Sequence, residues 1–283
     1  MRKLVRGAAV FGACALLGAM AIAQGELTGN DILDQMREKG VLFLQGGDLI
    51  FQARFDLVFA DGTLGQNEFK IFISEGDEAT GEPDRLLIYY LAPEDIAGTI
   101  FLSVIPPEGD ARMWLYLPAL GLVKELISES EQGQSFAGTA LTYEQIGGAV
   151  DYSADYTATR LADSTVSVTV DGASSERPVY VLEISAKPGA TVDYPKGKLW
   201  VDVEELTPVR SEFYDKTGRL EIVLEILRLE TFEDNLVPTL LKACNQKDTT
   251  CTTIEVLEKE RATLPAEIFT PAALPTFTPE AYR

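Results

Sequence analysis

The chain has 283 residues, 46% of them hydrophobic and 24% charged, which is typical of a globular protein and excludes wholesale disorder. Its formal net charge of −20 at pH 7 opposes contact with phosphate backbones, so we expect no nucleic-acid partner. The absence of histidine excludes the usual Ser–His–Asp and Cys–His nucleophiles and His-ligated metal sites.

The N-terminus has the pattern of an export signal. Three basic residues precede an apolar run at positions 8–20, and the small-x-small sequence AIA follows it. We expect a signal peptide over residues 1–23, cleaved after Ala23, which leaves 21 basic and 44 acidic residues and a net charge of −23. Such a surface favours solubility outside the cytoplasm. It also repels anionic lipids, so any lipid must be held inside a shielded pocket.

A helix is predicted at the start of the mature chain. Thr28 can cap it, with Asp31 as the reciprocal partner three residues later, and Gly40 ends it. The apolar stripe of this helix consists of Ile32, Leu33 and Met36.

A long β-hairpin follows, because the hydrophobic period changes from 3.6 to 2 after Gly46-Gly47. Asp61-Gly62 predicts the turn between its two strands. The side chains that share its apolar face are Leu49, Phe51, Ala53, Phe55, Leu57, Phe59, Phe69, Ile71 and Ile73. Long alternating strands favour an antiparallel sheet with one covered side and one solvated side.

Further strands are predicted from apolar runs bounded by turn residues. They cover 85–91, 99–105, 112–117, 121–128, 164–170, 178–185, 198–203, 209–214 and 219–229. A short helix begins after Thr142 and ends at Gly147-Gly148. We interpret Asn235–Cys244 as a short helix or an irregular connection, and the proline-rich C-terminus as an extended or disordered tail. The total is about ten or eleven strands with two or three short helices.

The sequence PEDIAG at positions 93–98 separates two of these strands. Pro93 cannot donate to a strand ladder and Gly98 permits an unusual backbone conformation, so we interpret the segment as a corner. Glu94 and Asp95 are sequence neighbours that point apart on an extended backbone, and 44 acidic residues make any single pair weak support for a two-carboxylate glycosidase. We therefore expect a protein without enzymatic activity.

Three cysteines occur, and Cys14 leaves with the signal peptide. A lipoprotein cleavage site at Cys14 is disfavoured, because it lies inside the apolar run with Phe11 three positions before it. In an oxidising compartment, Cys244 and Cys251 are predicted to form one disulfide that closes a short polar loop. Two thiols without histidine lack the usual zinc ligand set, so we expect neither a metal nor another cofactor.

Aromatic residues crowd the first half of the mature chain. On strands such side chains usually form core, which is the default interpretation of each of them. A strongly curved sheet with few helices cannot easily fill its own concave side, however, and an apolar pocket there is a natural ligand site. The candidate residues of the pocket wall are Phe51, Phe55, Leu57, Phe69, Ile71, Tyr90, Phe101, Trp114, Tyr116, Phe136 and Tyr143.

Three segments, PEDIAGTIFL, RMWLYLPALGLVKEL and SFAGTALTYEQIGG, stand in an order that resembles the longer branch of the LolA-like family of outer-membrane lipoprotein-sorting proteins. Two later segments agree, DYPKGKLWVDVEELTPVRSEFYDKTGRLEIVLEI and AEIFTPAAL, so the resemblance covers roughly Asp48 to Leu274. The family's corner motif falls on Pro93, Ile96 and Gly98, which the resemblance places at the mouth of the pocket. Its later motifs fall on Trp114, Tyr116, Pro118, Phe136, Gly138 and Tyr143.

The resemblance implies a mainly β, α+β fold: a strongly curved antiparallel sheet, or incomplete β-barrel, whose open side is plugged by short helices. We expect one such domain over residues 24–270, followed by a proline-rich tail over 271–283. The implied function is a periplasmic carrier that shields the acyl chains of a lipoprotein or lipid on the way towards the outer membrane. A membrane-bound donor or acceptor, such as a lipid-exporting transporter, is the implied partner.

Two departures from the family pattern leave the cargo open. Ala140 stands where the branch often has an acid, and the chain carries an extra cysteine-bearing segment near its end. Two alternatives also stay open at this point. One is a non-catalytic sensor or scaffold that reports lipid or partner status to a membrane protein. The other is a structural envelope protein with an ordinary filled core.

Overall fold

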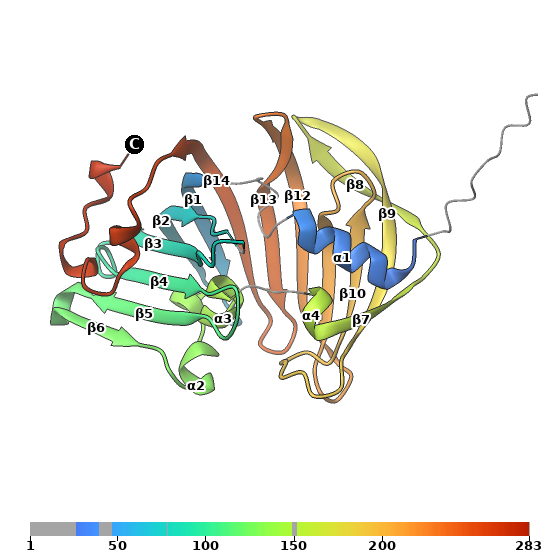
Figure 1. Cartoon of the computed structure of the whole chain (residues 1–283), viewed down its shortest axis with the longest axis horizontal. Coiled ribbons are helices and arrows are strands. Elements are labelled where there is room, and N and C mark those ends of the chain that lie inside the picture. The colour runs from blue at the N-terminus through green and yellow to red at the C-terminus, as the bar shows by residue number, and fades with distance from the viewer. Residues whose placement is uncertain (1–26, 40–46, 78, 149–151, 283) are drawn as a thin grey trace, which may run out of the picture.

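A computed structural model of the chain describes residues 27–39, 47–77, 79–148 and 152–282; the predicted signal peptide and Gly40 lie outside them. The described strands form one curved, mainly antiparallel sheet, with short helices lying against it (Figure 1). The strands are β1 (Asp48–Val58), β2 (Leu64–Ser74), β3 (Asp84–Ala92), β4 (Ile100–Ile105), β5 (Arg112–Leu117), β6 (Leu122–Glu125), β7 (Tyr156–Arg160), β8 (Ser164–Val170), β9 (Ala173–Ala186), β10 (Lys196–Asp202), β11 (Pro208–Tyr214), β12 (Leu220–Phe232), β13 (Asn235–Asn245) and β14 (Thr250–Ala262). The α-helices are α1 (Gly29–Lys39), α2 (Glu129–Gln132), α3 (Tyr143–Gly147) and α4 (Tyr152–Asp155). The predicted fold class is confirmed.

The order of strands divides the sheet into two parts. One part runs from β14 through β1 to β6, and β13 joins it to the other. In the second part β11, β10, β9, β8 and β12 are neighbours in that order, and β11 also pairs with β12, so these five strands close into a small barrel. Among the described strand pairs, only the short β8–β12 contact is parallel.

Helix α1 begins as its sequence predicts. The backbone N–H of Asp31 donates to Thr28 Oγ1 at 3.2 Å, and the N–H of Thr28 donates to Asp31 Oδ2 at 2.8 Å, which satisfies two otherwise free donors. Ile32 and Leu33 are buried against Leu182 and Leu199 and other apolar residues of the strands on the barrel side. The helix therefore covers that part of the sheet (Figure 1).

The first hairpin also folds as predicted. Gly62 has φ of 81° in the turn, and Ala53 pairs with Phe69, which sets the register of β1 on β2. Because side chains alternate along a strand, Phe55 and Phe69 lie on one face, which we call the inner face, while Ile50 and Phe72 lie on the outer face. Each face of this part of the sheet is buried in a separate apolar core.

Two strands were not anticipated as such. The interpretation of Asn235–Cys244 as a helix or irregular connection is wrong, since the segment is β13, and the following β14 was not predicted. Pro238 is tolerated in β13 where the register against β12 shifts, because a missing N–H costs less at a bulge. With β7 also unforeseen, the described part of the chain has fourteen strands rather than ten or eleven.

The C-terminal segment is ordered rather than extended or disordered. It forms three 3₁₀ turns, Ala266–Phe269, Leu274–Thr276 and Pro279–Ala281. Leu274 is 1% exposed, and the Phe277 ring lies 5.2 Å from that of Phe72 on the outer face. Lys70 Nζ donates to the carbonyl oxygen of Pro279 at 3.2 Å. Buried apolar contacts therefore hold this tail, which its proline content alone did not reveal.

Candidate functional site

Six aromatic side chains meet on the inner face of β1–β4. They are Phe55, Phe69, Tyr90, Phe101, Phe136 and Tyr143, and we call them the aromatic cluster. Phe136 is fully buried at its centre, with ring centroids 5.6 Å from Phe69, 5.6 Å from Tyr90 and 5.7 Å from Phe101. Such tilted and edge-to-face contacts add about 0.5–1.5 kcal/mol per pair to area burial.

Phe136 and Tyr143 do not come from the sheet. They belong to a connection between β6 and β7, residues 133–148, which we call the plug segment. Phe136 stands on a tight turn in which Ala137 and Gly138 both have positive φ, 49° and 77°. The alanine pays a steric cost for this conformation, so contacts elsewhere must hold the turn in place.

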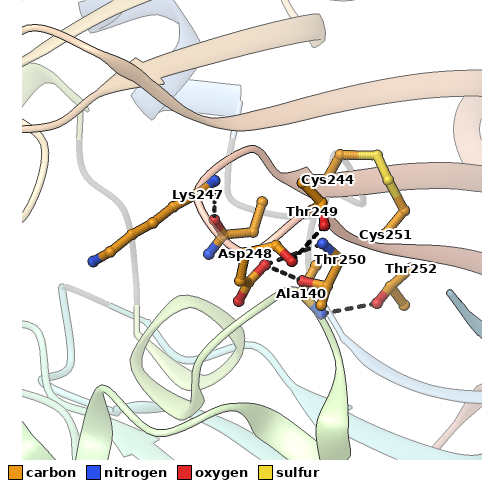
Figure 2. Close-up of a disulfide and its surroundings, with 9 residues drawn as sticks. Ala140, Cys244, Lys247, Asp248, Thr249, Thr250, Cys251 and Thr252 are labelled. Atoms are coloured by element: carbon orange, nitrogen blue, oxygen red, sulfur yellow. Dashed lines mark hydrogen bonds between the residues drawn. A yellow bond between two sulfur atoms is a disulfide. The ribbon is translucent and has the colours of Figure 1, made fainter. Parts of the chain in front are cut away.

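Two buried polar side chains of the sheet hold that turn. Asn67 Nδ2 of β2 donates to the carbonyl oxygen of Ala137 at 2.8 Å. The Ala140 N–H donates to Thr252 Oγ1 of β14 at 2.9 Å, directly beside the disulfide (Figure 2). The plug segment is thus fixed at its tip by single hydrogen bonds from two strands.

The disulfide joins Cys244 of β13 to Cys251 of β14, as predicted. The two cysteines are directly opposite each other in the ladder, and the turn between them closes the β13–β14 hairpin. Because Thr252 follows Cys251, the cross-link also lies next to the residue that accepts the hydrogen bond from Ala140 (Figure 2).

Helix α3 forms the second half of the plug segment. Its cap is the one predicted: the Gln145 N–H donates to Thr142 Oγ1, and the Thr142 N–H donates to Gln145 Oε1. Ser103 Oγ donates to the Gly147 carbonyl oxygen at 2.6 Å. A Cβ at Gly147 would lie 2.5 Å from Phe101 Cζ, so glycine permits the close docking of the helix on β4.

Tyr90 carries a buried polar group within this apolar cluster. The residue is 3% exposed, and its hydroxyl has no hydrogen-bond partner among the described residues. A buried hydroxyl without a partner costs about 1–3 kcal/mol. Burial raises the pKa of the Tyr90 hydroxyl, and the neighbouring Tyr143 raises it further, so the group is a protonated donor at neutral pH.

The predicted corner lies beside Tyr90. The Ala92–Pro93 peptide bond is cis, and Gly98 has φ of 81° with its N–H donating to the Tyr90 carbonyl oxygen at 2.9 Å. Ile96 is partly buried against the aromatic cluster. The segment is therefore a turn that returns the chain from β3 to β4 at one edge of the cluster.

The other predicted wall residues divide between the two faces. Ile71 packs against the aromatic cluster, and Phe51 packs beside it against Leu49 and Val237. Leu57 is 4% exposed on β1. Trp114 and Tyr116 belong instead to the outer core with Leu274, so the structure does not bring them together with the cluster. Alternation explains this: Met113 and Leu115, one residue away on β5, face inward.

Sequence reasoning missed the residues that hold the plug segment. Asn67 lies two residues before Phe69 and shares its face, but it stands in the polar run 66–68, which gave no signal of a buried contact. Thr252 could not be found either, because no strand was predicted around it.

Two cavities of about 220 Å³ lie elsewhere, and neither touches the aromatic cluster. The first is lined by Ile50, Gln52, Lys70, Glu258, Lys259 and Glu260. The second is lined by Asn30, Leu33, Asp34, Ser153, Tyr156 and Lys187. The cluster is filled by its own side chains.

Within the described ranges, cysteine and acidic side chains form no group of three or more that could hold a metal ion. In that same part of the chain, none of the helices combines the length and apolar character needed to cross a membrane. The chemistry that the inner face offers is apolar contact, with the Tyr90 hydroxyl embedded in it.

Comparison with known proteins identifies the family. A family model described as that of an uncharacterized protein matches residues 82–276, well over half of the chain, and the fold is shared with solved LolA-superfamily structures. The chain belongs to this family, and its fold is the one seen in the solved LolA-superfamily structures. No curated protein matches its sequence significantly.

Three solved structures show the LolA-like fold over 87% of the chain. A DUF1329 family protein from Desulfovibrio piger is 25% identical, with a TM-score of 0.75 over 97% of its own length. A domain from Vibrio parahaemolyticus, provisionally named as an outer membrane lipoprotein-sorting protein, is 24% identical, with a TM-score of 0.73 over 98% of its length. The LolA superfamily protein NE2245 from Nitrosomonas europaea is 18% identical, with a TM-score of 0.61 over 98% of its length.

Proposed function

We propose that this LolA-like protein is a non-catalytic carrier that shields the acyl chains of a lipoprotein or lipid against the inner face of its sheet. The observation that carries this proposal is the way the aromatic cluster is covered. Its lid is a short connection, rather than a second sheet, held by the packing of Phe136 and by a few side-chain hydrogen bonds. Withdrawal of Phe136 from the centre of the cluster would expose an apolar surface without breaking any strand pairing of the sheet.

The energetics of an acyl chain require such a surface. At about 0.8 kcal/mol per CH₂, a 14-carbon chain in water costs roughly 11 kcal/mol. A permanently open pocket of that affinity would retain its cargo. Here Phe136 competes for the same place, and its burial returns about 1.5–3 kcal/mol when the cargo leaves. The described arrangement is, in this proposal, the closed form.

The proposed place of action is the periplasm, with transfer towards the outer membrane between a membrane-bound donor and acceptor. The predicted export signal supports this, as does the provisional name of the Vibrio relative. We expect N-terminal sequencing of the mature protein to start at Gln24, one residue after the proposed cleavage site.

The test is whether the protein carries lipid. Native purification followed by solvent extraction and mass spectrometry is expected to yield acyl lipid or lipoprotein in stoichiometric amount, and delipidated protein is expected to bind a fluorescent acyl probe. An empty protein that also fails to bind the probe contradicts the proposal.

A second test uses the lid itself. Phe136→Ala is expected to destabilise the closed form by about 3–5 kcal/mol and yet to strengthen binding of the acyl probe. The matched control is Phe72→Ala, which removes an equally buried ring from the outer core. It should cost similar stability with no gain in affinity. Equal effects of the two variants on probe binding would show that Phe136 is only core.

A further inference from the structure

The hydroxyl of Tyr90 is unexplained by packing. It is buried within the aromatic cluster and has no hydrogen-bond partner among the described residues, although buried polar groups in native proteins nearly always have one. The Tyr143 hydroxyl is its polar neighbour, but no hydrogen bond of ordinary geometry joins the two. A phenylalanine would fill the same space without this cost. The hydroxyl is therefore a buried donor that remains available to a ligand.

The position of Tyr90 indicates that its hydroxyl becomes accessible to a ligand when the plug segment moves away. Its ring packs edge-on against Phe69 at 4.8 Å, on the rigid sheet, and lies 5.6 Å from Phe136, on the plug segment. When the plug segment withdraws, both Phe136 and Tyr143 leave the space in front of the phenol, and Tyr90 stays with β3. The vacated space then contains the Tyr90 donor in a mainly apolar surrounding, next to the corner formed by residues 92–99. Asn67 and Ser103, which donate to the plug segment in the closed form, are the other donors of the sheet there.

We propose that Tyr90 is the polar anchor of the site, and that its hydroxyl donates a hydrogen bond to the ester carbonyl oxygen of a bound fatty-acyl group. This inference rests on the carrier function proposed above and specifies its ligand as an acyl ester rather than a bare hydrocarbon. A carbonyl is a suitable partner because an O–H donor in a site of low dielectric rejects ligands that leave it unpaired. The hydrocarbon chain takes the place of Phe136, and the ester lies at the corner side.

The experiment compares wild type with Tyr90→Phe, which removes only the hydroxyl. Three competitors displace a fluorescent acyl probe: methyl palmitate as a free ester, a dipalmitoylated lipopeptide as the lipoprotein form, and hexadecane as a chain without a carbonyl. We expect the variant to bind an ester about tenfold more weakly, to bind hexadecane at least as well, and to melt at a higher temperature when empty. A loss confined to the lipopeptide assigns the ester to lipoprotein, and a loss confined to methyl palmitate assigns it to free lipid.

The matched control is Tyr89→Phe, which removes the same group from the opposite face of β3, where Tyr89 packs against the C-terminal segment. It should leave all three affinities unchanged. Equal ester affinity in wild type and Tyr90→Phe overturns the anchor while leaving the carrier function intact. Failure of wild type to bind any of the three competitors overturns the carrier function, and the anchor with it.

Discussion

Asp202 is the carboxylate that the fold buries most completely, at 0% exposure at the end of β10. Its oxygens accept two hydrogen bonds from Arg177, at 2.6 and 2.8 Å, and two from the backbone N–H groups of Glu204 and Glu205. Burial opposes ionisation, but these hydrogen bonds outweigh it and hold the pKa of Asp202 below its usual value. The ion pair between Arg177 and Asp202 therefore joins β9 to the turn after β10.

Removal of this carboxylate is expected to be severe. Asp202→Ala leaves the mostly buried Arg177 without its buried partner and should lower the free energy of unfolding by about 3–5 kcal/mol. Because the folded pKa lies below the unfolded one, the contribution is present above the usual pKa of 3.8 and is lost as pH falls through the folded pKa. Urea unfolding across this range measures it, and the gap between wild type and variant should narrow in acid.

The control for that experiment is Glu204→Gln. Glu204 also contacts Arg177, at 3.1 Å, but its side chain is 69% exposed, so its loss should cost less than about 1 kcal/mol. A cost for Glu204→Gln similar to that of Asp202→Ala would mean that burial does not decide the strength of these pairs.

Among the elements, the β13–β14 hairpin links the disulfide to the plug segment. Thr252→Val removes the acceptor of the Ala140 N–H with little change of shape and leaves that N–H buried, a cost of about 1–3 kcal/mol. We expect faster amide hydrogen exchange in residues 136–146 and tighter acyl-probe binding, because the closed form loses a contact that the open form does not need. The control is Thr253→Val, on the other side of the strand, which should change neither the exchange rate of residues 136–146 nor the affinity for the acyl probe. Slow exchange in both variants would contradict the role given to Thr252.

The same hairpin shows where sequence patterns stop being sufficient. The run of charged residues in β14 has no clear alternation of its own, and its strand conformation depends on distant partners such as Arg54, whose Nη2 lies 2.6 Å from Glu255 Oε2. Short-range patterns cannot reveal such pairing. β1 and β2 were predictable because their alternation is strong and a two-residue turn signal joins them.

The candidate site was predictable to a similar degree. Alternation placed Phe55, Phe69 and Ile71 on one face correctly, because neighbouring strands of a hairpin share their register. It could not place Trp114, since nothing local relates the faces of β5 to those of β1. Nor could it show that Phe136 fills the concave side, because that contact joins residues far apart in the chain.

At the scale of the whole molecule, the β1–β6 part is a layer covered on both faces by irregular chain. The plug segment covers the inner face, and the C-terminal segment covers the outer core around Phe72, Trp114 and Leu274. The two covering segments differ in how many buried apolar side chains they contribute. The C-terminal cover buries Leu264, Ile268, Phe269 and Leu274, each 7% exposed or less, which makes it an integral part of the fold rather than a lid.

Deletion of residues 264–283 is therefore expected to uncover the outer core. The loss of four buried side chains, at about 1.5–3 kcal/mol each, is comparable to the whole stability of a typical domain. The shortened protein should aggregate or melt far below the full-length chain in a thermal scan. A melting temperature within a few degrees of wild type would show that the segment is a dispensable appendage.

The pairing of β1 with β14 also governs the order in which the molecule can assemble. The first strand is completed on one edge by the last, across partners such as Arg54 and Glu255 that are 201 residues apart. A chain that emerges N-terminus first can form the β1–β2 hairpin early, but the other edge of β1 stays unpaired until nearly the whole polypeptide is available. Loop-closure entropy makes this contact slow, and an open edge with an aromatic face invites aggregation. We therefore expect the open edge of β1 to be the part of the growing chain most prone to association until the final strand closes the sheet.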